Sequence, residues 1–245
     1  MFNLFKKKKK EISTLKSLVK VDIHSHLLPN IDDGSKSLEE SIDMIRAYKE
    51  LGYKKLITTP HIMADFYRNT PSTIHKALNL LQKELLKENI DIKIEVAAEY
   101  YYDDGFLENL NTKDILTFGD NYLLFETSYV EKPFGLEDII FEIQSRGYKA
   151  VLAHPERYRY IKDFKKYHKL KELNVYFQIN LNSIIGGYGN SAKEKVLYLI
   201  DKGLVDFIGS DAHHIKHLNA LKEAINHPIY KTIFNKNHIL NDTLL

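Results

Sequence analysis

The stretch SLEESIDMIRAYKELGYKKLITTPH, residues 37–61, contains the unit from which the chain is built. Its first part has apolar residues that recur at spacings of three and four: Leu38, Ile42, Ile45, Tyr48 and Leu51. That spacing is typical of a helix that packs one face on a sheet. Gly52 then stands where a left-handed cap ends such a helix, and a β-rich run at 55–59 leads to His61. The stretch therefore predicts a helix, a turn, and a strand that ends at a residue able to bind metal.

The same design recurs further along the chain. Gly147 precedes the run 150–153, which ends at His154. Gly203 precedes the run 205–209, which ends at Ser210, Asp211 and His213. We expect a fourth unit of this kind with Asn174 at the cap, because Asn also tolerates the left-handed conformation.

The sequence also predicts where three helices begin. Ser37-x-x-Glu40 and Ser191-x-x-Glu194 have the pattern of capping boxes. Thr70-Pro71 predicts an N-cap followed by proline at the first helical position.

Seven strand candidates follow, most of them separated by helical segments: residues 19–26, 55–59, 93–98, 122–126, 150–153, 175–180 and 205–209. This alternation is typical of an α/β fold with a parallel barrel. An open doubly wound sheet is the alternative, although no glycine-rich phosphate loop follows the first strand. We expect a basic tail and lead-in over 1–18 and a single barrel domain over 19–245.

The composition excludes several classes of protein. The chain of 245 residues has no Cys, so disulfides, thiolate metal sites and cysteine-based phosphatase chemistry are excluded, and any metal is held by N and O ligands. A formal net charge of +2 is too balanced to indicate nucleic-acid binding. No run approaches the roughly 18 apolar residues that a membrane span needs, and residues 1–10 lack the apolar segment of a secretory signal. We therefore expect a cytoplasmic protein.

Five consecutive lysines, Lys6 to Lys10, lie next to Phe2, Leu4 and Phe5. We expect a solvated tail here, as is usual for charge runs. Weak contact with an anionic membrane surface or with an acidic partner tail is the alternative.

Active sites of such barrels lie at the carboxyl ends of the strands. Nine metal-capable residues stand at these positions: His24, His26, Asp33, His61, Glu99, Glu126, His154, Asp211 and His213. His24 and His26 are two residues apart in an extended run, so their side chains share a face, and Asp211 and His213 have the same spacing. Nine N and O ligands exceed the roughly six that one ion takes, so two or three metal ions are implied.

Some of these residues also have purely structural interpretations. A single His in a strand is usually a hydrogen-bonded core or surface imidazole rather than a metal ligand. The two pairs of residues spaced two apart, His24 with His26 and Asp211 with His213, make metal binding the favoured interpretation at these positions. Asp33 lies in Asp32-Asp33-Gly34, which is a good turn sequence without any metal. His61 and His154 each adjoin a proline and could simply mark the turn that ends a strand.

The order of these motifs resembles a known family. VDIHSHLLPNIDDGSKSLEES, residues 21–41, resembles the opening of the PHP (polymerase and histidinol phosphatase) superfamily. The resemblance continues through TTPH, AAEYY, LLFE, AHPERY and GSDAH, which end at residues 61, 101, 126, 158 and 213. Within the superfamily, IDDGSKSLEES, residues 31–41, and HPERY, residues 154–158, look most like the bacterial tyrosine-protein phosphatases associated with capsule and exopolysaccharide export.

The resemblance implies a distorted (β/α)7 barrel of the PHP type with a trinuclear centre, usually of manganese; Fe, Co and Zn suit the same donors. It implies one ion held by His24, His26, Glu99 and Asp211, a second by Asp33, His61 and His213, and a third by Glu99, Glu126 and His154. It also implies that Arg157 binds phosphate, for which a planar guanidinium is well suited. The expected activity is hydrolysis of phosphotyrosine on the C-terminal tail of a membrane tyrosine kinase by a metal-activated water.

The sequence departs from some relatives after His213, where another phosphate-binding Arg is expected and the chain reads His214-Ile215-Lys216-His217. Lys216 or His217 is our candidate substitute. Tyr67 and Arg68 are candidates to line a cleft for an aromatic phosphoester. His61 or His213 is a candidate to assist the leaving oxygen, although metal ligation competes with that role.

Two rival functions remain open at this point. A small-molecule phosphatase of the histidinol-phosphate type would use nearly the same metal site. A non-catalytic regulatory module would bind a kinase tail through the basic N-terminus.

Overall fold

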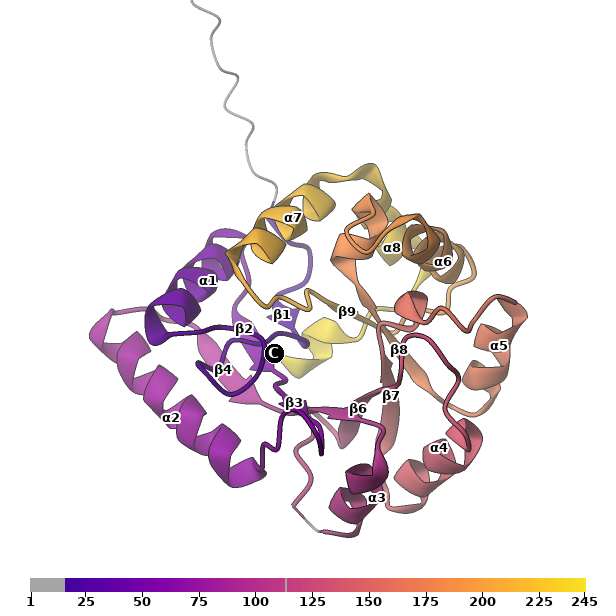
Figure 1. Ribbon diagram of the computed structural model, residues 1–245. Helices are drawn as coiled ribbons and strands as arrows, with labels where there is room; N and C mark the ends of the chain where they lie inside the picture. Colours follow the sequence, from indigo (N-terminus) through magenta and orange to yellow (C-terminus); the bar gives the residue numbers. More distant parts are fainter. Residues whose placement is uncertain (1–15, 113) are drawn as a thin grey trace, which may run out of the picture.

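The computed structural model describes residues 16–112 and 114–245, and the chain there adopts an α/β fold. Helices surround the strands (Figure 1). The run from Lys6 to Lys10 lies outside the described residues. The division into a tail over 1–18 and a domain over 19–245 stays a prediction.

The strands of the described residues form two parallel sheets. The smaller sheet has the order β1-β2-β4, with β1 at Val21–Asp22, β2 at Lys55–Thr58 and β4 at Lys93–Val96. The larger has the order β3-β5-β6-β7-β8-β9: His61–Ile62, Glu99–Tyr101, Tyr122–Glu126, Lys149–Ala153, Tyr176–Asn180 and Phe207–Gly209. A further parallel bridge joins Ser25, after β1, to Ala212, after β9. The parallel strands therefore curl, as predicted for a barrel-like α/β fold.

Two strands end earlier than predicted, and each is followed by a second short strand. The run 55–59 is β2, which ends before Pro60, and β3 follows; the run 93–98 is β4, which ends at Val96, and β5 follows. Proline has no N–H and cannot continue a ladder. Thr58 pairs with Val96 and His61 with Glu99, so residues 97–98 lie opposite the same break. The first strand is also shorter than predicted. The exact count of seven strands stays a prediction.

Eight α-helices lie in the described residues: α1 Leu38–Glu50, α2 Pro71–Lys87, α3 Asp104–Asn111, α4 Leu136–Ser145, α5 Lys165–Glu172, α6 Asn190–Asp201, α7 Ile215–Asn226 and α8 Pro228–Lys236. Three short 3₁₀ turns accompany them: η1 Pro155–Arg157, η2 Leu181–Ile185 and η3 Asn241–Leu244. The helices follow one another around the periphery in chain order from α1 to α6, while α8 lies between α6 and α7 (Figure 1). None of the described helices is both long and apolar enough to cross a bilayer.

The predicted helix ends are confirmed. Gly52, Gly147 and Gly203 have φ of +92°, +85° and +67°, and Asn174 has φ of +56°. All four are therefore in the left-handed region, where Gly and Asn end a helix at least cost.

Of the three predicted helix starts, one is confirmed, one is confirmed in part and one is wrong. Thr70 caps α2 with Pro71 at the first position, as predicted. Ser37 caps α1 by accepting from the backbone N–H of Glu40, but the Glu40 carboxylate accepts from Lys36 N rather than closing a box. The capping box at Ser191 is wrong: α6 begins at Asn190 after Gly189, so Ser191 is already inside the helix.

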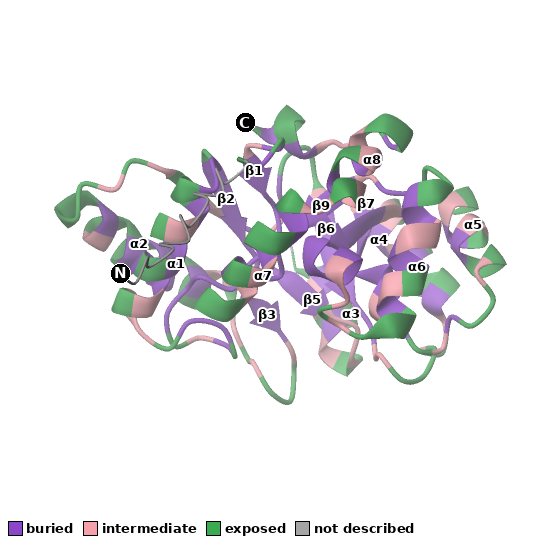
Figure 2. Cartoon of the chain, turned by 90° about the horizontal axis from the view of Figure 1, so that it is seen from above, coloured by how far each residue is buried: buried purple, intermediate pink, exposed green. Residues whose placement is uncertain are grey.

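The buried apolar residues divide between the two sides of the sheet. On β6, Leu123 and Phe125 belong to the cluster shared with the helices, whereas Leu124 belongs to a smaller cluster enclosed by the strands. Buried strands and exposed outer helix faces are seen in Figure 2. Because side chains alternate along a strand, Glu126 faces the same side as Leu124, toward the enclosed interior. The fold therefore directs this carboxylate inward.

Candidate metal centre and active site

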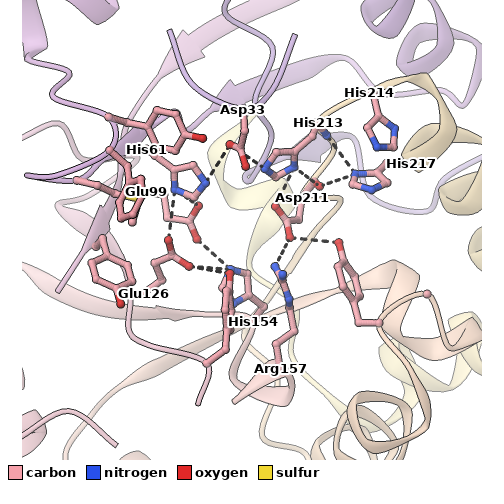
Figure 3. A pocket seen from close by; sticks show the side chains of 17 residues that line it. Asp33, His61, Glu99, Glu126, His154, Arg157, Asp211, His213, His214 and His217 are labelled. Carbon is pink, nitrogen blue, oxygen red and sulfur yellow. Dashed lines mark hydrogen bonds and ion pairs between the residues drawn. The ribbon is translucent and has the colours of Figure 1, made fainter. Parts of the chain in front are cut away.

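All nine predicted metal ligands converge at one edge of the sheets, and most of their side chains are buried. Figure 3 shows those that line the adjacent cavity, which excludes His24 and His26. Glu126 ends β6, His154 follows β7 directly, and Asp211 follows β9. His61 and Glu99 were expected to follow strands but are the first residues of β3 and β5. The shared break at Pro60 causes this difference, since pairing resumes at these two residues.

Glu99 lies at the centre of the cluster and is fully buried. Its Oε2 lies 3.1 Å from His24 Nε2, 3.4 Å from His26 Nε2 and 3.2 Å from His61 Nδ1. Its Oε1 lies 2.9 Å from His154 Nε2. One carboxylate therefore touches four imidazoles, as a bridging ligand would.

Asp211 and Asp33 complete the cluster on its other side. Asp211 Oδ1 lies 3.6 Å from Nε2 of both His24 and His26. Asp33 Oδ1 lies 3.5 Å from Nε2 of His61 and 3.5 Å from Nε2 of His213.

Several of these atoms are buried without a hydrogen-bond partner among the described residues: His24 Nε2, His26 Nε2, His61 Nδ1 and Glu99 Oε2. Leaving a buried polar atom unpaired costs about 1–3 kcal/mol. The four atoms face one another, and imidazole nitrogens with carboxylate oxygens are typical ligands of divalent transition metals. The residues present therefore fit metal ions.

The imidazole rings of His24 and His26 are oriented by hydrogen bonds at Nδ1, the ring nitrogen that faces away from the cluster. Gln178 Oε1 lies 2.7 Å from His24 Nδ1 and also accepts from the backbone N–H of His154. Asp32 Oδ2 lies 2.8 Å from His26 Nδ1. Because both oxygens accept, each Nδ1 donates, and each neutral ring presents the lone pair of Nε2 to the cluster.

Sequence reasoning missed both orienting residues. Asp32 was assigned only to a turn. Gln178 and Asn180 lie at alternate positions of the β8 run YFQIN and are fully buried. A polar side chain at every second position of a buried strand was the signal that could have found them.

The electrostatics of the cluster favour a protonated His24 beside an ionised Asp211. Burial disfavours a charged imidazole, but the carboxylates of Glu99 and Asp211 outweigh it and raise the pKa of His24 to about 9. Burial would raise the pKa of Asp211, yet His24, His26, His213 and Arg157 hold it well below the usual range. Cations and protons therefore compete for the same atoms.

Two of the candidate ligands have unusual backbone conformations. His154 has φ of +32° and Asp211 has φ of +51°, both in the left-handed region. Non-glycine residues persist there only when their surroundings hold them, and they often cluster at functional sites.

Arg157 ends η1 and reaches the cluster from its outer side. Its Nη1 donates to Asp211 Oδ2 at 2.8 Å, and its side chain is 23 % exposed. This is the one hydrogen bond that its side chain makes within the described part of the chain. A guanidinium has five N–H donors, so an edge is left for an anion.

A cavity of about 710 Å³ opens over the cluster. Its lining includes Arg157, Tyr67, Phe66, Tyr188, His214 and His217. Tyr67 stacks on His61 with ring centroids 5.5 Å apart. Two predicted contact residues are placed elsewhere: Arg68 donates to the backbone oxygen of Ala64 outside the lining, and Lys216 is exposed on α7. Of the two candidate substitutes for an arginine, His217 is the one at the cavity.

The fold and the side-chain cluster define the class: an α/β protein of parallel strands with a buried histidine–carboxylate cluster that fits metal ions. The chain belongs to the family described as "Capsular polysaccharide synthesis, CpsB/CapC", which matches residues 20–237.

Known relatives agree with this assignment. The chain is 34% identical over 202 residues to tyrosine-protein phosphatase YwqE of Bacillus subtilis, covering 81% of this chain and 79% of the relative. It is 32% identical over 208 residues to tyrosine-protein phosphatase CpsB of Streptococcus pneumoniae, covering 80% and 83%. A solved structure from work on YwqE and CpsB, described as unique metal-dependent tyrosine phosphatases, superposes with a TM-score of 0.76 at 30% identity, covering 88% of this chain and 91% of that one.

Proposed function

We propose that this chain is a metal-dependent protein-tyrosine phosphatase whose reaction takes place in the cavity above Glu99. The observation that carries the proposal is the group of unpartnered, buried ligand atoms beside a guanidinium with free donors. The names of the relatives support the same activity. The chain has no Cys, so a cysteine nucleophile is excluded.

His24, His26, Glu99 and Asp211 are proposed to hold one ion, Asp33, His61 and His213 a second, and Glu99, Glu126 and His154 a third. The distances around Glu99 support its bridging role. They also allow His61 to group with Glu99 and Glu126, and His26 to join Asp33, His61 and His213. We propose Mn²⁺, with Fe, Co or Zn as alternatives for the same donors. When bound, such ions activate water and neutralise phosphoryl charge.

The side chains of the chain itself bind and orient the substrate. Arg157 is proposed to bind two phosphoryl oxygens through its free edge, since a planar fork matches them. His217 is proposed as a second contact, because it lines the cavity while Lys216 does not. His61 and His213 act first as ligands; assistance to the leaving tyrosyl oxygen is a second proposed role for them.

The proposed partner is the phosphorylated C-terminal tail of a membrane tyrosine kinase, with the protein in the cytoplasm. The family's link to capsular polysaccharide synthesis supports this partner. We also propose that residues 19–245 form one barrel of seven units. The constant register across the break, Thr58 with Val96 and His61 with Glu99, supports counting β2 with β3 and β4 with β5 as single strands.

Substrate profiling tests the function. Metal-stripped protein is reloaded with Mn²⁺ and offered a phosphotyrosine peptide, the matched phosphoserine peptide and histidinol phosphate. We expect phosphate release from the phosphotyrosine peptide at a kcat/KM at least about tenfold above the other two. Preference for histidinol phosphate would replace the proposal with a small-molecule phosphatase, and no release from any substrate with metal bound would indicate a non-catalytic module.

A further inference from the structure

The guanidinium of Arg157 lies between two tyrosine rings. Its Cζ is 4.4 Å from the ring centroid of Tyr129 and 4.4 Å from that of Tyr188. Tyr129 lies in the loop after β6, and Tyr188 lies in the turn between η2 and α6. Two loops that are distant in sequence therefore cover both faces of one planar cation, which is a favourable cation–π geometry.

Each ring is fixed by its hydroxyl to a carboxylate of the cluster. Tyr129 OH donates to Glu126 Oε2 at 2.8 Å, and Tyr188 OH donates to Asp211 Oδ2 at 3.2 Å. These hydrogen bonds hold each ring in place beside the guanidinium.

The turn that carries Tyr188 depends on glycine. It reads Gly186-Gly187-Tyr188-Gly189, and Gly186 and Gly189 have φ of +87° and +89°. A Cβ on Gly187 would lie 2.9 Å from the backbone oxygen of Asn182. The local sequence therefore places one aromatic ring at the cavity with glycines on either side, although no role for this stretch was apparent from the sequence.

Only the edge of the guanidinium is left free. Nη1 is bonded to Asp211 and both faces are covered, while Arg157 and Tyr188 both line the cavity. A free arginine side chain loses much rotamer freedom when it binds an anion, whereas a side chain that is already held loses little.

We propose that Tyr129 and Tyr188 are positioning residues that clamp Arg157 with its free edge toward the cavity, so that a phosphoryl group binds a preformed site. The inference rests on the phosphate-binding role of Arg157 in the proposed function. Because the clamp acts through ring faces, Phe should replace each tyrosine better than Leu does.

The test compares Tyr188→Leu and Tyr129→Leu with the matched controls Tyr188→Phe and Tyr129→Phe in Mn²⁺-loaded protein. We expect each Leu variant to weaken inhibition by inorganic phosphate and to raise KM for the phosphotyrosine peptide by about tenfold, with kcat changed less. The Phe variants should stay within about threefold of wild type for both quantities.

A double-substitution experiment separates positioning from general damage. Tyr188→Leu should no longer weaken phosphate binding when Arg157 is already Ala, because no guanidinium remains to be held. Leu variants that bind phosphate like wild type, Phe variants as impaired as Leu variants, or an undiminished effect in the Arg157→Ala background would each overturn the inference.

The two proposals fail separately. If wild type hydrolyses the phosphotyrosine peptide while the Leu variants match it, the clamp is wrong and the function stands. If wild type is inactive, the phosphatase proposal is wrong, and calorimetric binding of inorganic phosphate to the same variants still decides the clamp.

Discussion

Arg157 and Asp211 form an ion pair, 2.8 Å between Nη1 and Oδ2, that joins the two halves of the site. The other oxygen of the same carboxylate, Oδ1, faces His24, His26 and His213. Asp211 therefore has one oxygen for the metal side and one for the anion side. Asn180 Nδ2, at 2.6 Å from Oδ2, holds the carboxylate in this orientation.

Arg157→Lys keeps the charge but removes the planar fork. We expect KM for a phosphotyrosine peptide to rise by at least about tenfold, because a lysine ammonium cannot bind two phosphoryl oxygens in the same way. Steady-state kinetics measure this. Arg68→Ala is the matched control, since Arg68 lies outside the cavity lining and should leave KM within about twofold. Equal effects of the two substitutions would remove Arg157 from the anion site.

Asp32→Asn tests the orientation of His26. The amide keeps the shape of the side chain but loses the charge that faces His26 Nδ1. Loss of such an outer contact lowers metal affinity by about 10–100-fold. Titration of metal-free protein with Mn²⁺ gives the affinity directly. An unchanged affinity would show that Asp32 serves only the turn.

Metal binding should depend on pH in a definite direction. The pKa of His24 in the metal-free cluster is about 9, above its ordinary value, so the ring is protonated at neutral pH. A metal needs the neutral ring, so apparent Mn²⁺ affinity falls as pH decreases from 9, by about tenfold per pH unit for each proton displaced. Calorimetry in buffers of different ionisation enthalpy counts those protons. Binding without proton release at pH 7 would contradict the prediction.

Phe66 is 76 % exposed although it lines the cavity. Its loop is closed by paired backbone hydrogen bonds between Met63 and Tyr67, at 2.9 and 3.2 Å. An exposed ring on a fixed loop is suited to contact an aryl phosphate. We expect Phe66→Ala to raise KM about tenfold for a phosphotyrosine peptide and to leave KM for acetyl phosphate unchanged. Leu86→Ala, an exposed residue of α2 outside the cavity lining, is the control. Equal increases for both substrates would show that Phe66 does not select the aryl group.

The metal-capable residues of the site could be predicted from the sequence because of one property of parallel α/β folds. Parallel strands bring their carboxyl ends to one edge, so polar residues at the ends of apolar runs must meet there. His24 and Asp211, which are far apart in the sequence, approach to 3.6 Å for this reason.

The strand break, the choice between Lys216 and His217, and the orienting role of Gln178 could not be predicted, because they depend on contacts between residues that are distant in the sequence. The break between β4 and β5 at residues 97–98 arises from Pro60, which lies opposite between β2 and β3, and the sequence of the β4 run cannot indicate it. Lys216 and His217 are adjacent, but successive residues of a helix point about 100° apart, and only the fold decides which one faces the cavity. The pairing of Gln178 with His24 likewise requires the three-dimensional register.

The central claim is that the histidines and carboxylates around Glu99 hold catalytic metal ions. Anomalous diffraction from crystals of Mn²⁺-loaded protein, recorded on both sides of the manganese absorption edge, tests it most directly. The account predicts two or three peaks within the cluster, with Glu99 bound to more than one ion and no peaks there in Glu99→Gln/Asp211→Asn protein. Fully loaded crystals with no peak in the cluster, or with ions bound only elsewhere, would contradict it.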